Sequence, residues 1–253
     1  MILQTVQFFV RIPTQDVVLL PSSMTIFHST EPIVRVKQQH LDVQDIKGLL
    51  TVNWKIGNYT LFSGLYTRID QVFLLWGWIS LMIFITAQFF PISWIDQAYW
   101  WSGLTLLATL GMIVLTYCWV RIEHMTWLVY CWALLMFIGV GLTNLAIFGG
   151  WSQILSNLCP LWLLVCALGY LATGIGLQSR SFTLAGLLHF LAIPLLSYVS
   201  GLQFLVTGMI LAGTLLFFAE VQWDMRPPIE SKFLTPEQLA FNRQQNRKRH
   251  MES

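Results

Sequence analysis

The stretch Val72-Phe-Leu-Leu-Trp-Gly-Trp-Ile-Ser-Leu-Met-Ile-Phe-Ile-Thr-Ala-Gln-Phe-Phe90 decides the fold class. It contains no Lys, Arg, Asp or Glu. The hydrocarbon core of a bilayer is about 30 Å thick, and a helix needs about 20 mostly apolar residues to cross it. The stretch therefore predicts a transmembrane helix.

The composition of the whole chain agrees with this interpretation. Of 253 residues, 56% are hydrophobic and 10% are charged, whereas soluble domains carry about 25% charged residues. The 4 cysteines form no C-x-x-C pair, and we interpret them as small apolar side chains. We expect the lipid bilayer as the main partner, other membrane proteins or a second copy of the chain as further partners, and no nucleic acid.

Five further segments resemble the first in length and hydropathy. The predicted spans are residues 72–90, 100–120, 127–148, 160–177, 183–199 and 204–222. The fifth is the shortest and contains Pro194, which could kink it or make it partly re-entrant. Short connections make consecutive helices antiparallel neighbours. The sequence thus predicts an all-α bundle of six transmembrane helices.

The basic residues give the bundle an orientation. Of 14 Lys and Arg residues, only Arg121 and Arg180 lie between predicted spans, and both fall in connections on the same side as the two ends of the chain. Cytoplasmic loops carry the excess of Lys and Arg. We therefore expect both termini on the cytoplasmic side of the membrane. The membrane is expected to be a bacterial plasma membrane or a thylakoid membrane.

The N-terminal region, residues 1–71, contains two signals for strands. Residues 33–37 alternate like a short strand, and two alternating runs flank Gly57-Asn58. Gly-Asn between such runs is typical of a β-hairpin. We expect a small cytoplasmic hairpin at residues 51–62 that rests on the bundle or on lipid headgroups, because a lone hairpin is marginal in water.

The C-terminal tail, residues 223–253, predicts a short cytoplasmic helix at residues 236–249. Thr235 is a good N-cap and Gln238 can complete a capping box. The helix ends in four basic residues, which are Arg243, Arg247, Lys248 and Arg249. These residues either contact anionic lipid or a partner, or form a solvated tail that fixes the topology.

Ionisable and polar groups inside a membrane are costly and point to function. His189, within the fifth span, could ligate haem or chlorophyll, or form a hydrogen bond to a facing helix. The spans contain no second His for a bis-His haem, so the structural role is favoured. Asn144 and Glu220 are candidate pathway residues or polar contacts of the bundle, and Glu220 has Arg121, Arg180 and Arg226 as candidate partners.

Catalytic and metal-binding motifs are missing from the sequence. It has no Walker A loop, no H-E-x-x-H, no nucleophile elbow and no acidic metal cluster. We therefore expect no enzyme, no catalytic residue and no bound metal, and no cofactor unless His189 binds haem or chlorophyll.

Three short stretches carry a resemblance to a known family. They are Tyr66-Thr-Arg68, Tyr117-Cys-Trp-Val-Arg121-Ile-Glu-His124, and Trp223-Asp-Met-Arg-Pro-Pro-Ile229 followed by Phe233. Over about residues 50–235 the chain resembles a domain of unknown function found in integral membrane proteins of cyanobacteria and plastid-bearing organisms. In that family the fourth-to-fifth connection is richer in charged and aromatic residues than 178–182 here. The resemblance implies a photosynthetic organism and a thylakoid membrane, but no activity.

The sequence is compatible with three functions. The first is a non-enzymatic scaffold, assembly factor or accessory subunit of a membrane complex. The second is a small permease or channel-like carrier, and the third is a haem- or chlorophyll-binding protein. Convergence of His189, Asn144 and Glu220 on one cavity would favour the carrier, whereas scattered positions would favour partner docking.

Overall fold

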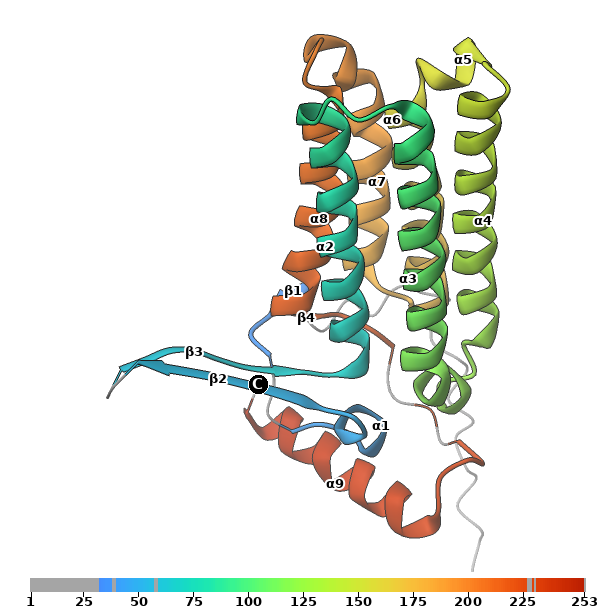
Figure 1. Cartoon of the computed structure of the whole chain (residues 1–253). Helices are drawn as coiled ribbons and strands as arrows, with labels where there is room; N and C mark the ends of the chain where they lie inside the picture. The colour runs from blue at the N-terminus through green and yellow to red at the C-terminus, as the bar shows by residue number, and fades with distance from the viewer. Residues whose placement is uncertain (1–31, 38–39, 57–58, 227–228, 230, 253) are drawn as a thin grey trace, which may run out of the picture.

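The fold is an up-and-down bundle of apolar helices with a small folded cap at one end (Figure 1). The computed structural model describes residues 32–37, 40–56, 59–226, 229 and 231–252. In these residues, 6 helices are long and apolar enough to cross a membrane, which confirms the predicted spans. They are α2 (Arg68–Phe89), α3 (Trp94–Ile122), α4 (Thr126–Phe148), α6 (Leu158–Leu177), α7 (Arg180–Leu195) and α8 (Gln203–Glu220).

The ends of several spanning helices differ from the predicted bounds, and in two cases a polar cap extends the helix. Thr67 and Asp70 form a capping box that starts α2 before the apolar run. The hydroxyl of Ser93 accepts a hydrogen bond from the backbone N–H of Asp96, so α3 begins at Trp94 and not at residue 100. The sixth helix ends at Glu220, before the predicted residue 222, because the chain then becomes a strand.

Pro194 lies at the end of the fifth span. A proline has no N–H for the helix and its ring clashes with the carbonyl four residues earlier. Accordingly, α7 ends at Leu195 and continues as the 3₁₀ turn η1 (Leu196–Tyr198). The segment Arg180–Tyr198 is long and apolar enough to cross a membrane. It continues from α7 into η1 without a reversal of the chain, so the structure has no re-entrant turn in this segment.

Small residues let neighbouring helices approach closely. The most extensive helix contacts are those of α2 with α8 and of α6 with α7. A Cβ built on Gly208 of α8 would lie 2.5 Å from Cβ of Phe84 in α2. Glycine therefore sets the spacing of the α2–α8 pair, as small residues commonly do between membrane helices.

Both described ends of the chain lie at the same end of the bundle (Figure 1). We call this the cap end, and the opposite end, with the short helix α5 (Ser152–Leu155), the loop end. The elements that form the cap are β1 (Val34–Arg35), α1 (Val43–Ile46), β2 (Leu50–Ile56), β3 (Tyr59–Tyr66), β4 (Gln222–Trp223) and α9 (Pro236–Glu252).

The cap contains the predicted hairpin and the predicted helix. Strands β2 and β3 pair antiparallel from Leu50 opposite Tyr66 to Ile56 opposite Tyr59. The predicted turn at residues 57–58 lies outside the described residues. Helix α9 begins with the expected capping box between Thr235 and Gln238 and runs to Glu252, past the predicted end at residue 249.

One feature of the cap was not predicted: it joins the two ends of the chain. β1 pairs antiparallel with β4, Val34 lying opposite Trp223. The N-terminal region and the C-terminal tail therefore form one structure and not two separate extensions.

Candidate functional site

The contact between α1 and α9 is made of buried polar groups. The side chain of Asn242 accepts a hydrogen bond from the backbone N–H of Val43 at 2.9 Å and donates to Gln44 at 3.0 Å. Arg249 donates to both carboxylate oxygens of Asp42 at 3.1 Å and to the carbonyl of His40 at 3.0 Å. Asn242 satisfies an N–H at the first turn of α1, where the helix itself offers no partner.

This contact corrects part of the expectation for the basic tail. Arg249 is a structural tie within the cap and not a solvated or lipid-binding charge. Arg243 and Arg247 are exposed, and Lys248 is half-buried, so these three stay candidates for contact with lipid or a partner.

Glu123 connects the cap to the junction between α3 and α4. It accepts a hydrogen bond from Gln44 at 3.2 Å, and its carbonyl accepts one from Arg226 at 2.6 Å. Its carboxylate lies 3.9 Å from the Arg226 guanidinium. Burial raises the pKa of Glu123 to about 6, and the charge of Arg226 opposes this shift only in part.

Asp224 holds the cap against the N-terminus of α7. Its carboxylate accepts hydrogen bonds from the backbone N–H groups of Arg180 and Ser181 at 3.0 and 2.9 Å, and from Arg180 Nε at 2.9 Å. The hydroxyls of Ser179 and Ser181 add bonds of 3.0 and 2.7 Å. Burial alone would raise the pKa of Asp224, but the hydrogen bonds from Ser181 and Arg180 outweigh it and hold the pKa below its ordinary value.

The hairpin is fixed at its base and projects beyond the bundle at its tip (Figure 1). At the base, the buried Tyr66 donates a hydrogen bond to Glu220 at 2.7 Å. Lys37 lies 4.4 Å from the centre of the Tyr66 ring and pairs with Asp70 at 2.9 Å. At the tip, Trp54 is 68% and Tyr59 is 80% exposed. The hairpin is thus a fixed arm with an exposed aromatic end.

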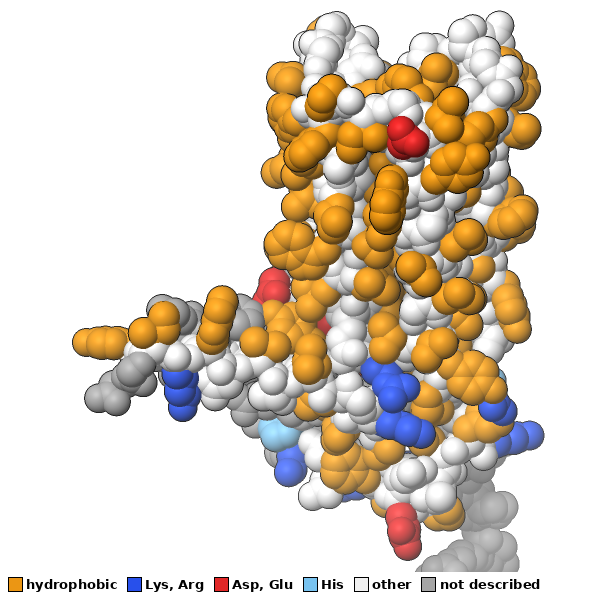
Figure 2. Space-filling view, in the orientation of Figure 1, with side chains coloured by type: hydrophobic (Ala, Val, Ile, Leu, Met, Phe, Trp, Pro, Cys, Tyr) orange, Lys and Arg blue, Asp and Glu red, His pale blue; other side chains and the backbone are white. Residues whose placement is uncertain are grey.

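One face of the hairpin turns toward the bundle. Successive strand residues point to opposite faces, so Leu50, Val52 and Trp54 share a face with Tyr66 across the strand pair. Tyr66 reaches Glu220 at the end of α8, so this face looks toward the bundle. Figure 2 shows hydrophobic side chains along this side of the hairpin.

The three polar residues selected from the spans do not come together. His189 is fully buried, and its Nδ1 donates to the carbonyl of Ala185 in its own helix at 2.7 Å. Asn144 exchanges hydrogen bonds with Ser102 of α3 toward the loop end. Glu220 lies at the cap end.

Two expectations for these residues are therefore corrected. The hydrogen bond of His189 is made within α7 and not to a facing helix, although its ring packs against Tyr170 of α6. Glu220 bonds Tyr66, while Arg226 and Arg180 pair with Glu123 and Asp224. Asn144 is confirmed as a polar contact of the bundle.

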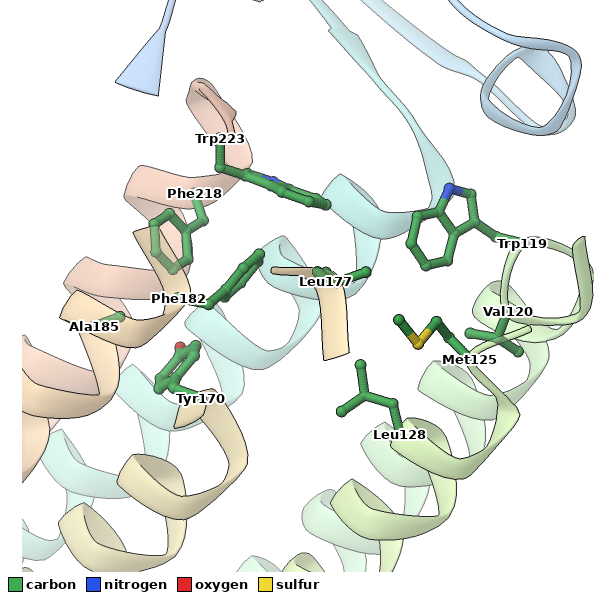
Figure 3. Packing of buried hydrophobic residues seen from close by; sticks show 10 residues of the cluster. All are labelled: Trp119, Val120, Met125, Leu128, Tyr170, Leu177, Phe182, Ala185, Phe218 and Trp223. Carbon is green, nitrogen blue, oxygen red and sulfur yellow. The ribbon is translucent and has the colours of Figure 1, made fainter. Parts of the chain in front are cut away.

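The bundle has an apolar cavity along its centre. Its volume is about 160 Å³, and helices α2, α3, α4, α6 and α8 supply most of its wall. Six tryptophans line it: Trp76, Trp101, Trp119, Trp132, Trp162 and Trp223. Figure 3 shows the end nearest the cap, where Trp119 and Leu128 lie on one side and Trp223 and Phe182 on the other. Of the residues described, His189, Asn144 and Glu220 are not part of the lining.

Sequence reasoning missed both the cavity and the polar ties of the cap. In the described part of the chain, His, Cys, Asp and Glu form no group of three or more placed to hold a metal ion. Comparisons with protein-family models, with curated proteins and with solved structures find no match.

Proposed function

We propose that this integral membrane protein is a non-enzymatic scaffold, assembly factor or accessory subunit of a membrane complex, with its cap in the cytoplasm. The observation that carries the proposal is the hairpin arm. It holds Trp54, Ile56 and Tyr59 out beyond the bundle, while hydrogen bonds and an ion pair fix its base.

The arm has the chemistry of a protein-binding surface. Tryptophan and tyrosine are enriched at protein interfaces, and clustered exposed apolar groups mark interaction sites. A two-stranded sheet is marginally stable in water by itself. Among the described residues, β2 pairs only with β3, so a strand of a partner could extend the sheet at the outer edge of β2. A fixed base lowers the ordering cost of such binding.

A carrier of polar solutes fits the geometry less well. His189, Asn144 and Glu220 are spread along the bundle and do not line the central cavity that the described residues enclose. The walls of that cavity are apolar and aromatic. A polar solute would lose its hydration there without gaining partners, which is costly.

The charge distribution supports the proposed orientation. Arg121 contacts the ring of Phe233 in the segment before α9, and Arg180 pairs with Asp224. Both cations between the spans therefore lie at the cap end, with those of the cap itself. Figure 2 shows the visible Lys and Arg side chains at this end, the side that the positive-inside rule places in the cytoplasm.

The test is the native size of the tagged protein after extraction in mild detergent, with the co-eluting proteins identified by mass spectrometry. We expect the wild type to elute in a larger particle with defined partners. Trp54→Ser combined with Ile56→Ser should release those partners by weakening binding about tenfold or more, as hot-spot aromatics do. Lys55→Ser, in the same strand, is the control and should retain them.

Two results would overturn the proposal. One is elution of the wild type as a monomer or a small homo-oligomer from native membranes. The other is an unchanged set of partners in the double variant, which would mean that the arm rests on lipid and does not bind a protein.

A further inference from the structure

The central cavity is long and narrow. Its lining runs along α2 from Ile69 to Ala87, which at about 1.5 Å per helical residue corresponds to about 27 Å. The hydrocarbon core of a bilayer is about 30 Å thick. The cavity therefore follows the bundle over most of the thickness of the membrane.

The volume limits what the cavity can hold. A compact cavity of about 150 Å³ is just large enough for one benzene molecule. Here about 160 Å³ is spread along most of the bundle, so the free space is narrow and has the volume of a chain segment of about six carbons. A flat macrocycle such as haem or chlorophyll is far too large for it, whereas a segment of a hydrocarbon chain is not.

Several hydroxyl groups of the wall already have hydrogen-bond partners, whereas the buried indole N–H of Trp76 has none among the described residues. The hydroxyls of Thr116, Thr143 and Thr173 each donate to a carbonyl of their own helix at 2.8 Å. Two of them also accept a hydrogen bond from an indole N–H, from Trp162 at 3.2 Å and Trp132 at 3.0 Å. A buried water needs two to four polar partners, so the wall offers water little and favours an apolar occupant.

We propose that the cavity binds a segment of one extended hydrocarbon chain. The chain is either the acyl or isoprenoid tail of a membrane lipid, or a linear polyene pigment. Both have the narrow cross-section and the lack of polar groups that the walls require. The contacts that hold it are dispersion contacts, small one by one and large in sum. Binding here is independent of partner docking at the hairpin, because the cavity lies within the bundle.

Ser80 and Met82 offer a matched pair of variants. Ser80 lines the cavity from the middle of α2, so Ser80→Phe places a ring across the space. Met82 lies two residues further along the same helix and is 55% exposed. Among the described residues, it is not one of those that line the cavity. Met82→Phe adds the same ring on the lipid side and is the control. Ala87→Phe fills the cavity nearer the loop end and serves if Ser80→Phe does not fold.

The first measurement is the content of the native protein. The protein is extracted with surrounding lipid by a styrene–maleic acid copolymer, and its absorption spectrum and extractable hydrocarbons are compared with those of bulk membrane. Visible absorption bands would identify a polyene pigment, whereas a colourless protein enriched in one lipid species would identify a lipid tail. Either enrichment should fall at least tenfold in Ser80→Phe and persist in Met82→Phe.

The second measurement uses cis-parinaric acid, a linear fluorescent polyene, added to delipidated protein. We expect saturable energy transfer from tryptophan with one site per chain, and an affinity at least tenfold lower in Ser80→Phe than in Met82→Phe. The proposal would be overturned if a cavity-filling variant that elutes at the wild-type size bound cis-parinaric acid as tightly as Met82→Phe does. It would also be overturned if the wild-type protein carried no enriched hydrocarbon. Because native size is measured separately, failure here is distinguishable from failure of the docking proposal.

Discussion

At the scale of single residues, Asp224 is the side chain whose loss should cost most. It joins the segment after α8 to the N-terminus of α7 through backbone and side-chain donors. Removing the carboxylate takes away the acceptor shared by Arg180 Nε and these N–H groups. We expect Asp224→Ala to lower the free energy of unfolding by about 3 to 5 kcal/mol, as for a broken buried ion pair. Denaturation in mixed micelles, followed by circular dichroism, measures the change.

The control for Asp224→Ala is Asp96→Ala. Asp96 is exposed at the start of α3 and accepts a hydrogen bond from the Ser93 hydroxyl at 2.6 Å. A cap residue of this kind contributes about 1 kcal/mol. Equal losses for the two variants would show that Asp224 does not join the segments in the way described.

Glu123 should make the cap sensitive to pH. Its pKa is raised from 4.5 to about 6 in the folded protein, so the folded state holds the proton more tightly than the unfolded state. The stabilisation from this group is complete below about pH 4.5 and is lost as the pH rises through about 6. A shift of this size is worth about 2 kcal/mol.

We therefore expect Glu123→Gln to remove this part of the pH dependence and to be more stable than the wild type at pH 7.5. Glutamine keeps an acceptor for Gln44 but cannot ionise. Burial also raises the pKa values of Asp42 and Asp45, the latter to about 7, so the difference between variant and wild type is the quantity to compare. Parallel stability curves from pH 5 to 8 would contradict the prediction.

At the scale of elements, the α2–α8 pair depends on one close approach. Gly208→Ala places a Cβ 2.5 Å from that of Phe84, so the helices must separate. Overpacking of this kind costs about 1 to 3 kcal/mol. Gly213→Ala, in the same helix, has open space at its Cβ and should be neutral or stabilising by up to about 1 kcal/mol. Denaturation of both variants in mixed micelles tests this, and similar losses would contradict it.

The elements that were predicted correctly are those specified by local sequence. The spans follow from runs of apolar residues, the hairpin from alternation on both sides of Gly57-Asn58, and α9 from its capping box. Pairing of β1 with β4 could not be inferred, because Val34 and Trp223 are distant in sequence and each strand has only 2 residues. For the same reason, the contact of α1 with Asn242 and Arg249 left no recognisable pattern.

At the scale of the whole molecule, sequence gives the order of the helices but not which faces meet. Short loops predict antiparallel neighbours. The structure agrees for the consecutive pairs from α2 to α7, whereas α8 packs chiefly against α2 and only slightly against α7. Trp132 of α4 packs over Gly169 of α6, and Trp162 of α6 packs over Gly139 of α4, so these two lining rings lie against glycines of the facing helix. Hydropathy along the chain does not reveal such a match. The structural role favoured for His189 could not be detailed from sequence, because its packing against Tyr170 of α6 depends on tertiary structure, although its bond to Ala185 is local to α7.

Orientation in the membrane is a property of the whole molecule, and sided labelling can test it. The native cysteines are first replaced by serine or alanine, after which Lys55→Cys reports on the cap end and Tyr198→Cys on the loop end. Tyr198 is 84% exposed at the end of η1. Because the Lys and Arg residues of the described part of the chain gather at the cap end, translocation of the cap is disfavoured. A membrane-impermeant maleimide should therefore label position 198 in intact cells, or in right-side-out vesicles, and position 55 only after permeabilisation. The reverse pattern would place the cap outside, and the hairpin would then have to bind partners on that side.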